Sequence, residues 1–202
     1  MALQQDTVVL IHGLAANRLM MKPIEMHLRQ CGFDTLNWGY PSIRGDIERH
    51  ARRLLKTLKQ LERSPAINKI RLVTHSMGGI VARAALLQTR LKKVNRLVML
   101  GPPNHGSRVA TILAQGLGWL CRPLSQLSDT DDSFVNQLPP PGGMEIGIIA
   151  ALFDRVVAID STHLSTELEH RVIPSGHNSM LFRRDVASNV ANFLRRGRFV
   201  AR

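Results

Sequence analysis

Residues Ile70 to Arg83 read Ile-Arg-Leu-Val-Thr-His-Ser-Met-Gly-Gly-Ile-Val-Ala-Arg, and the predicted fold is built around them. The apolar run Ile70–Val73 predicts a strand, and the run Ile80–Leu87 predicts a helix that follows almost at once. Ser76 stands at the apex of the short turn between them. A strand, a sharp turn with a serine and then a helix form the geometry of a nucleophile elbow.

The residues around Ser76 are small, as such a turn requires, because the strand and helix backbones nearly touch there. Gly78 and Gly79 meet this requirement on the helix side. Thr74 departs from the G-x-S-x-G pattern, in which a glycine holds that position. The alternative is an ordinary strand-to-helix loop in which Ser76 caps the helix. A catalytic interpretation therefore depends on partners elsewhere in the chain.

Strands and helices alternate along the rest of the sequence. The predicted strands are Thr7–Ile11, Phe33–Trp38, Ile70–Val73, Val94–Leu100, Glu145–Leu152 and Arg171–Ile173. The predicted helices are Leu19–Cys31, Asp46–Arg63, Ile80–Gln88 and Leu181–Arg196. This alternation predicts an α/β fold, with a mostly parallel sheet of about six strands and helices on both faces, in three layers. Residues 1–202 suit a single domain.

The stretch 108–143 has weak periodicity and is harder to interpret. Its apolar residues could wall a binding pocket as a small cap or lid. They could equally pack an ordinary crossover helix onto the sheet. The apolar residues in question are Leu113, Leu117, Trp119, Leu120, Leu124 and Leu127.

A catalytic serine needs a general base and an acid that orients the base. Ligands bind at the carboxyl ends of the strands in a parallel sheet, so these partners should follow other strands. Asp154 follows the strand that ends near Leu152, and His177 follows the strand that ends at Ile173. The rival acid is Asp160, six positions beyond Asp154. The rival base is His170, but it precedes its strand and so falls at the wrong end of the sheet.

The order Ser76, Asp154, His177 is that of the α/β-hydrolases, and the chain resembles the small lipases and esterases of that superfamily over nearly its whole length. The resemblance is carried by the segments Val9–Leu14, Thr74–Gly79, Leu100–Ser107, Asp154–Val157 and Gly176–Leu181.

This resemblance implies a serine hydrolase that cleaves carboxylic esters, lipid-like or short-chain, through an acyl-enzyme. Ser76 is then the nucleophile, His177 the general base and acid, and Asp154 the orienting carboxylate. The backbone N–H groups of Met77 and Leu14 form the oxyanion hole. An acyltransferase or thioesterase using the same triad remains open, as does a non-catalytic protein that binds lipids or a partner.

Composition limits the other function classes. The 27 Lys and Arg against 15 Asp and Glu give a formal net charge of +12. Solvated helix faces are the favoured explanation of this charge, and weak peripheral association with a membrane is the alternative. Nothing resembles a nucleic-acid-binding module, so no nucleic acid is expected as a partner. The oligomeric state is left open.

No cofactor or metal is expected, because the sequence has no His-x-x-x-His pair, no clustered Cys and no phosphate-loop spacing. The stretch Met1–Asp6 lacks the features of a secretory signal, and no apolar run is long enough to span a membrane. Cys31 and Cys121 are far apart and do not suggest a disulfide framework. These features together predict a cytoplasmic protein.

Overall fold

The computed structural model describes residues 5–200 of the chain, so the N-terminal stretch in which no signal was expected lies mostly outside it. The core of the fold is a single six-stranded sheet with the strand order β2-β1-β3-β4-β5-β6. Every neighbouring pair of strands is parallel. The strands are β1 Gln5–Ile11, β2 Asp34–Trp38, β3 Ile67–His75, β4 Val94–Leu100, β5 Glu145–Ala151 and β6 Glu169–Ile173. The predicted fold class is confirmed.

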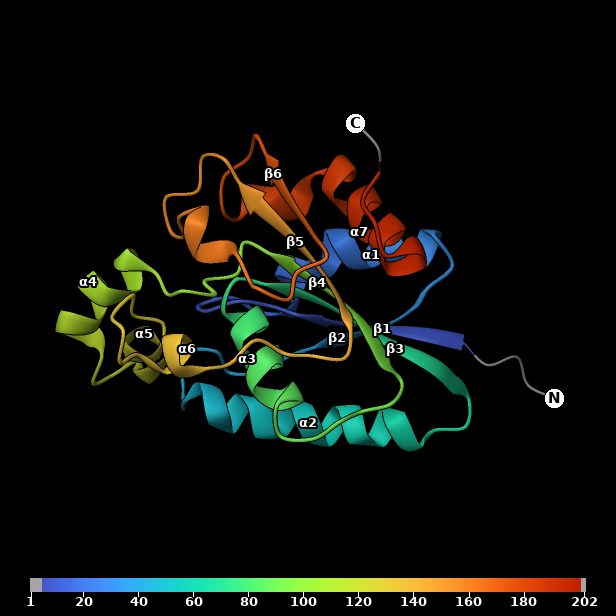
Figure 1. Cartoon of the computed structure of the whole chain (residues 1–202), viewed down its shortest axis with the longest axis horizontal. Coiled ribbons are helices and arrows are strands. Elements are labelled where there is room, and N and C mark those ends of the chain that lie inside the picture. The colour runs from blue at the N-terminus through green and yellow to red at the C-terminus, as the bar shows by residue number, and fades with distance from the viewer. Residues whose placement is uncertain (1–4, 201–202) are drawn as a thin grey trace.

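Helices cover both faces of this sheet (Figure 1). Helices α1 and α7 pack on one face, and α2 and α3 pack on the other. The helices are α1 Lys22–Gln30, α2 Ile47–Arg63, α3 Met77–Leu86, α4 Arg108–Leu117, α5 Arg122–Gln126, α6 Phe134–Gln137 and α7 Arg184–Arg196. Three short 3-10 turns are η1 Arg18–Met21, η2 Asp160–Thr162 and η3 Ser179–Phe182.

The central strand β3 has apolar side chains on both of its faces, because helices cover both sides of the sheet. Leu72 points into the core beneath α2 and α3, and Val73 points into the core beneath α1 and α7. Both side chains are fully buried, and burying a side chain of this kind contributes about 1.5–3 kcal/mol to folding. The elbow therefore follows a strand that is buried on both of its faces.

The ends of three predicted helices differ from the observed ones. The helix predicted over Ile80–Gln88 is α3, which begins directly after Ser76 and ends at Leu86. The first predicted helix is divided into η1 and α1, and Pro23 occupies the first turn of α1. The last begins at Arg184 instead of Leu181, after η3. In contrast, α2 starts as predicted, because the Asp46 side chain caps it by accepting a hydrogen bond from the Arg49 N–H at 2.7 Å.

The stretch 108–143 connects β4 to β5 and contains α4, α5 and α6, which gather at the end of the molecule where the strands finish (Figure 1). Leu124, Leu127 and Val135 are buried in the core shared with α2 and α3. Of the residues of α4, only Ala110 is buried. The stretch therefore packs onto the sheet through α5 and α6, whereas α4 lies largely outside the core. Among the helices of residues 5–200, none combines the length and apolarity needed to cross a membrane.

Candidate active site

Ser76 lies at the turn between β3 and α3 in an unusual backbone conformation, with φ 51° and ψ −129°. A residue with a side chain rarely adopts a positive φ, and such strain is common at functional sites. The Ser76 N–H donates to the Leu100 carbonyl at 2.9 Å, which ties the turn to β4. Its side chain makes no helix-capping hydrogen bond, so Ser76 is not an ordinary capping serine.

Three glycines make room for this turn. A methyl group placed on Gly78 would lie 2.6 Å from the carbonyl oxygen of His12, and one on Gly13 would lie 2.9 Å from the Cβ of Ser76. A methyl group on Gly79 would lie 3.3 Å from Thr74 Oγ1. Thr74 itself is fully buried and fits where the motif has its first glycine. The departure from the motif at Thr74 is therefore accommodated.

The predicted acid and base lie against each other. His177 Nδ1 lies 2.6 Å from Asp154 Oδ2, and the side chains are 10 % and 2 % exposed, respectively. The other oxygen of Asp154 accepts hydrogen bonds from the N–H groups of Val156 at 2.8 Å and Val157 at 2.9 Å. With its Nδ1–H given to Asp154, the imidazole keeps Nε2 free to accept a proton.

The environment of Asp154 favours its ionised form. Burial by itself raises the pKa of this carboxyl, but the hydrogen bond and charge of His177 and the two backbone N–H donors outweigh that effect. The pKa of Asp154 therefore falls below its ordinary value of 3.8. A carboxylate charged at neutral pH can hold His177 in one tautomer and stabilise its protonated form.

Gly101 supports this pair and is a residue that the sequence did not single out. It follows β4 with φ 55°, a backbone conformation that favours glycine. A methyl group there would lie 3.3 Å from the His177 ring and 3.6 Å from Asp154 Oδ2. The signal in the sequence was the glycine at the end of an apolar strand, before Pro102 and Pro103.

His75, the residue before Ser76, holds the loop of His177. Its Nε2 lies 3.1 Å from the His177 carbonyl oxygen, and the two rings pack at 4.8 Å with an angle of 47°. A carbonyl can only accept, so Nε2 carries the proton. Burial, with the charge of His177, lowers the pKa of His75 to about 3. His75 thus positions the base without adding a second positive charge.

The two predicted oxyanion donors come from two segments, Met77 from the start of α3 and Leu14 from the loop after β1. Met77 is the first residue of α3, where a helix leaves its N–H groups without intrahelical acceptors. The Leu14 N–H follows β1, and the end of that strand is clamped by Tyr40. The Tyr40 hydroxyl donates to the His12 carbonyl at 2.8 Å, and the two rings stack at 4.4 Å. This clamp is a second feature that the sequence did not reveal.

Ser76 and His177 both line a pocket of about 460 Å³. Its remaining walls are mostly apolar, from the loop after β1, from α4 and α5, and from the loop after β5. Among the described residues, the Ser76 hydroxyl makes no hydrogen bond, to His177 or to any other group, although both residues line this pocket. The apolar lining residues include Leu14, Met20, Val109, Leu113, Leu124, Leu127 and Val157.

The rival residues lie elsewhere. Asp160 is exposed in η2. His170 Nε2 lies 2.8 Å from Thr162 Oγ1, and its ring stacks on that of His163 at 3.8 Å. Among the described residues, neither rival is hydrogen-bonded to Ser76 or His177, whereas Asp154 lies 2.6 Å from His177. Within residues 5–200, no cluster of three or more His, Cys, Asp or Glu side chains has the arrangement needed to bind a metal ion.

The sequence of residues 46–114 matches a family described as the PGAP1-like alpha/beta domain. This range contains α2, β3, the elbow and β4. No protein of curated function matches the chain by sequence.

Solved structures match over nearly the whole chain. The mature lipase BlEst2 of Bacillus licheniformis is 17% identical, with a TM-score of 0.70 over 95% of this chain and 91% of the lipase. Esterase Pf2001 of Pyrococcus furiosus is 20% identical, with a TM-score of 0.67 over 96% of this chain and 82% of the esterase. Lipase B of Aspergillus fumigatus is 17% identical, with a TM-score of 0.78 over 95% of this chain and 52% of the lipase. The chain therefore has the α/β-hydrolase fold that these lipases and esterases share.

Proposed function

We propose that this protein is a carboxylic ester hydrolase that works through an acyl-enzyme on Ser76. The observation that carries the proposal is the 2.6 Å contact between Asp154 and His177, where His177 and Ser76 line the same pocket. The strained backbone of Ser76 and the lipases and esterases among the similar structures support it.

The proposed reaction has two halves. His177 Nε2 takes the proton of the Ser76 hydroxyl while Ser76 Oγ attacks the carbonyl carbon of the ester. The N–H groups of Met77 and Leu14 stabilise the negative oxygen of the tetrahedral intermediate. His177 then gives the proton to the leaving alcohol, and an acyl group remains on Ser76. Water, activated by His177, releases the acid and restores the hydroxyl.

The proposed substrate has an apolar acyl group. The pocket volume of about 460 Å³ and the leucine, valine and methionine side chains around it favour aliphatic chains over charged ones. The stretch 108–143 supplies Leu113, Leu124 and Leu127 to this wall, and we assign it as the cap of the site. Chain-length preference is then set by residues of the cap.

The test is a panel of p-nitrophenyl esters, from acetate through octanoate to palmitate, with wild type and Ser76→Ala. Wild type should turn over the esters, and Ser76→Ala should lose essentially all turnover, because the nucleophile is gone. Asp154→Asn should lower kcat by about 10³-fold or more, because the imidazole loses its orienting carboxylate.

Asp160→Asn is the matched control, since it makes the same chemical change at an exposed acid outside the pocket. It should retain wild-type turnover. Equal losses in Asp154→Asn and Asp160→Asn, or turnover that persists in Ser76→Ala, would contradict the proposal. Adding alcohol acceptors distinguishes a hydrolase from an acyltransferase, which would form new esters in place of free acid.

A further inference from the structure

The outer side of α2 carries a continuous positive charge. Six exposed side chains, which we call the basic face, lie along its 17 residues, a length of about 25 Å. Among residues 5–200, none of them forms an ion pair with a carboxylate. The basic face consists of Arg49, Arg52, Arg53, Lys56, Lys59 and Arg63.

The two acidic residues of α2 are half-buried and bonded to neighbouring segments, so they do not lie among the six exposed cations. Glu48 accepts a hydrogen bond from the Gln126 side chain of α5 at 2.5 Å. Glu62 accepts from the backbone N–H of Lys92 at 2.8 Å and of Lys93 at 3.1 Å. An ordinary solvated helix mixes charges of both signs on its exposed side, whereas α2 presents only cations there.

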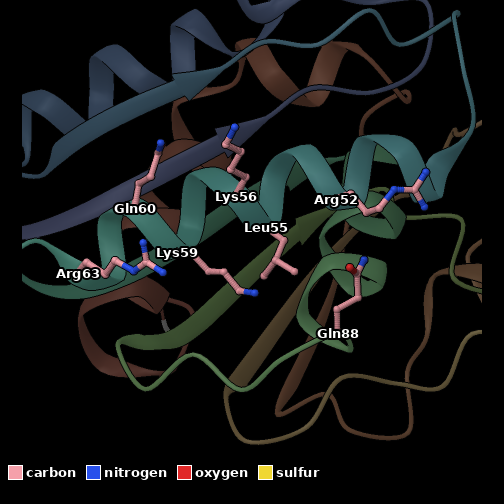
Figure 2. Close-up of a pocket in the computed structure, with 7 residues that line it drawn as sticks. All are labelled: Arg52, Leu55, Lys56, Lys59, Gln60, Arg63 and Gln88. Carbon is pink, nitrogen blue, oxygen red and sulfur yellow. The ribbon is translucent and has the colours of Figure 1, made fainter.

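A pocket of about 320 Å³ opens between the basic face and the end of α3. Figure 2 shows Leu55 and Lys59 of α2 directed toward Gln88, which follows α3. The floor is therefore apolar and the rim is cationic. A negatively charged headgroup fits such a rim. The lining residues are Arg52, Leu55, Lys56, Lys59, Gln60, Arg63 and Gln88.

An exposed apolar segment precedes α5, the helix that is bonded to the first turn of α2. Leu117, Trp119 and Leu120, here called the apolar tip, connect α4 to α5, and Trp119 is 82% exposed. Helix α5 is tied to the start of α2 by the hydrogen bond from the Ile47 N–H to Gln126 Oε1, at 2.7 Å. Cations beside exposed apolar side chains are typical of surfaces that bind at a membrane interface.

We propose that the basic face and the apolar tip together dock this protein on an anionic lipid bilayer. The basic face attracts the charged headgroups, and the apolar tip enters the boundary between headgroups and acyl chains. Nucleic acid is the other polyanion that could bind a basic helix. Recognition of single strands draws on aromatic side chains for stacking, and α2 contains no Phe, Trp or Tyr, whereas duplex binding is an outcome of the test below.

The first experiment measures co-sedimentation with vesicles of phosphatidylcholine, with and without phosphatidylglycerol. All variants carry Ser76→Ala, so binding is scored independently of ester hydrolysis. The test variant combines Arg52→Glu, Lys56→Glu and Lys59→Glu. Loss of each basic side chain near an anionic surface weakens partition about fivefold, so reversing three of them should weaken binding by about 100-fold or more.

The matched control combines Arg184→Glu, Arg196→Glu and Arg198→Glu on the opposite side of the sheet. It lowers the net charge from +12 by the same six units as the test variant. Its affinity for anionic vesicles should lie within a few fold of that of the parent protein. Thermal unfolding of both triple variants should match that of the parent protein, which verifies their folding without the ester assay.

Equal weakening in both triple variants would mean that only net charge matters and would overturn the proposal. Absence of binding to the anionic vesicles at about 0.1 M salt would also overturn it. So would tighter binding to a fluorescent DNA duplex than to the anionic vesicles in the same buffer. Failure of the ester assay alone would leave these binding results unaffected.

The second experiment follows tryptophan emission, since the chain has only two tryptophans and Trp38 is 9% exposed. Anionic vesicles should shift the emission to shorter wavelength as Trp119 enters the lipid. Trp119→Phe should abolish the shift. An unchanged spectrum of the parent protein on bound vesicles would show that the apolar tip stays in water and would overturn its assigned role.

Discussion

His75 couples the elbow to the base of the proposed triad. It is adjacent to Ser76 in sequence, and its ring reaches the backbone of His177 and packs against the imidazole. Gly101 supports the same imidazole from β4. Both contacts restrict the position of the His177 ring. The geometry of the site therefore depends on residues that take no part in the chemistry.

His75 should make stability depend on pH. Its pKa of about 3 in the folded chain lies below the ordinary 6.5, so below pH 6.5 the unfolded chain binds a proton that the folded chain does not. The contribution of neutral His75 to the free energy of unfolding is fully present above pH 6.5. It is lost at about 1.4 kcal/mol per pH unit as the pH falls toward 3.

His75→Gln isolates this effect, because glutamine can still donate a hydrogen bond to the His177 carbonyl but does not titrate. Urea unfolding at pH 7, 6, 5 and 4 should give a shallower fall in the free energy of unfolding for the variant. The other buried histidines titrate in both proteins and cancel in the comparison. Parallel curves for the two proteins would contradict a neutral, buried His75.

Helix α3 approaches β1 more closely than a side chain would permit. Gly78 faces the carbonyl oxygens of Ile11 and His12, each 2.6 Å from where a methyl group would stand. These are backbone atoms of the central sheet and have little freedom to move. The conformation of the elbow therefore depends on the close packing of α3 against β1 as well as on the turn at Ser76.

Two Gly→Ala substitutions in helices should act in opposite directions. Gly78→Ala should destabilise the protein by about 2–3 kcal/mol and lower ester turnover, because α3 must move off β1. Gly116→Ala in α4 has nothing within 4 Å of the new methyl group. It should stabilise the protein by up to about 1 kcal/mol through helix propensity. Thermal unfolding of both variants measures this, and a Gly78→Ala protein as stable as wild type would contradict the close packing.

Across the whole molecule, the sequence predicted the sheet, its two helical layers and the proximity of Asp154 to His177. The positions of Asp154 and His177 were accessible because parallel strands end at one edge of the sheet, so sequence order gives spatial proximity. The contact of His75 with His177 joins residues 102 positions apart and has no local signal. The same holds for the clamp of Tyr40 on His12, which depends on the packing of the loop after β2.

The stretch 108–143 was the least predictable part, because its buried residues follow neither a strand nor a helix period. Its outer helix α4 buries only Ala110, so little apolar contact opposes its opening. Amides of α4 should exchange with deuterium about 10³-fold faster than those of β3. Equal protection of α4 and β3 would contradict a cap that opens over the pocket.

The central claim is that Ser76 is the nucleophile, and covalent labelling by a fluorophosphonate tests it most directly. Peptide mapping by mass spectrometry should find one adduct, on Ser76, in wild type. Labelling should be unchanged in Ser165→Ala, an exposed serine, and absent in Ser76→Ala. An adduct on another serine, or labelling that persists in Ser76→Ala, would contradict the assignment.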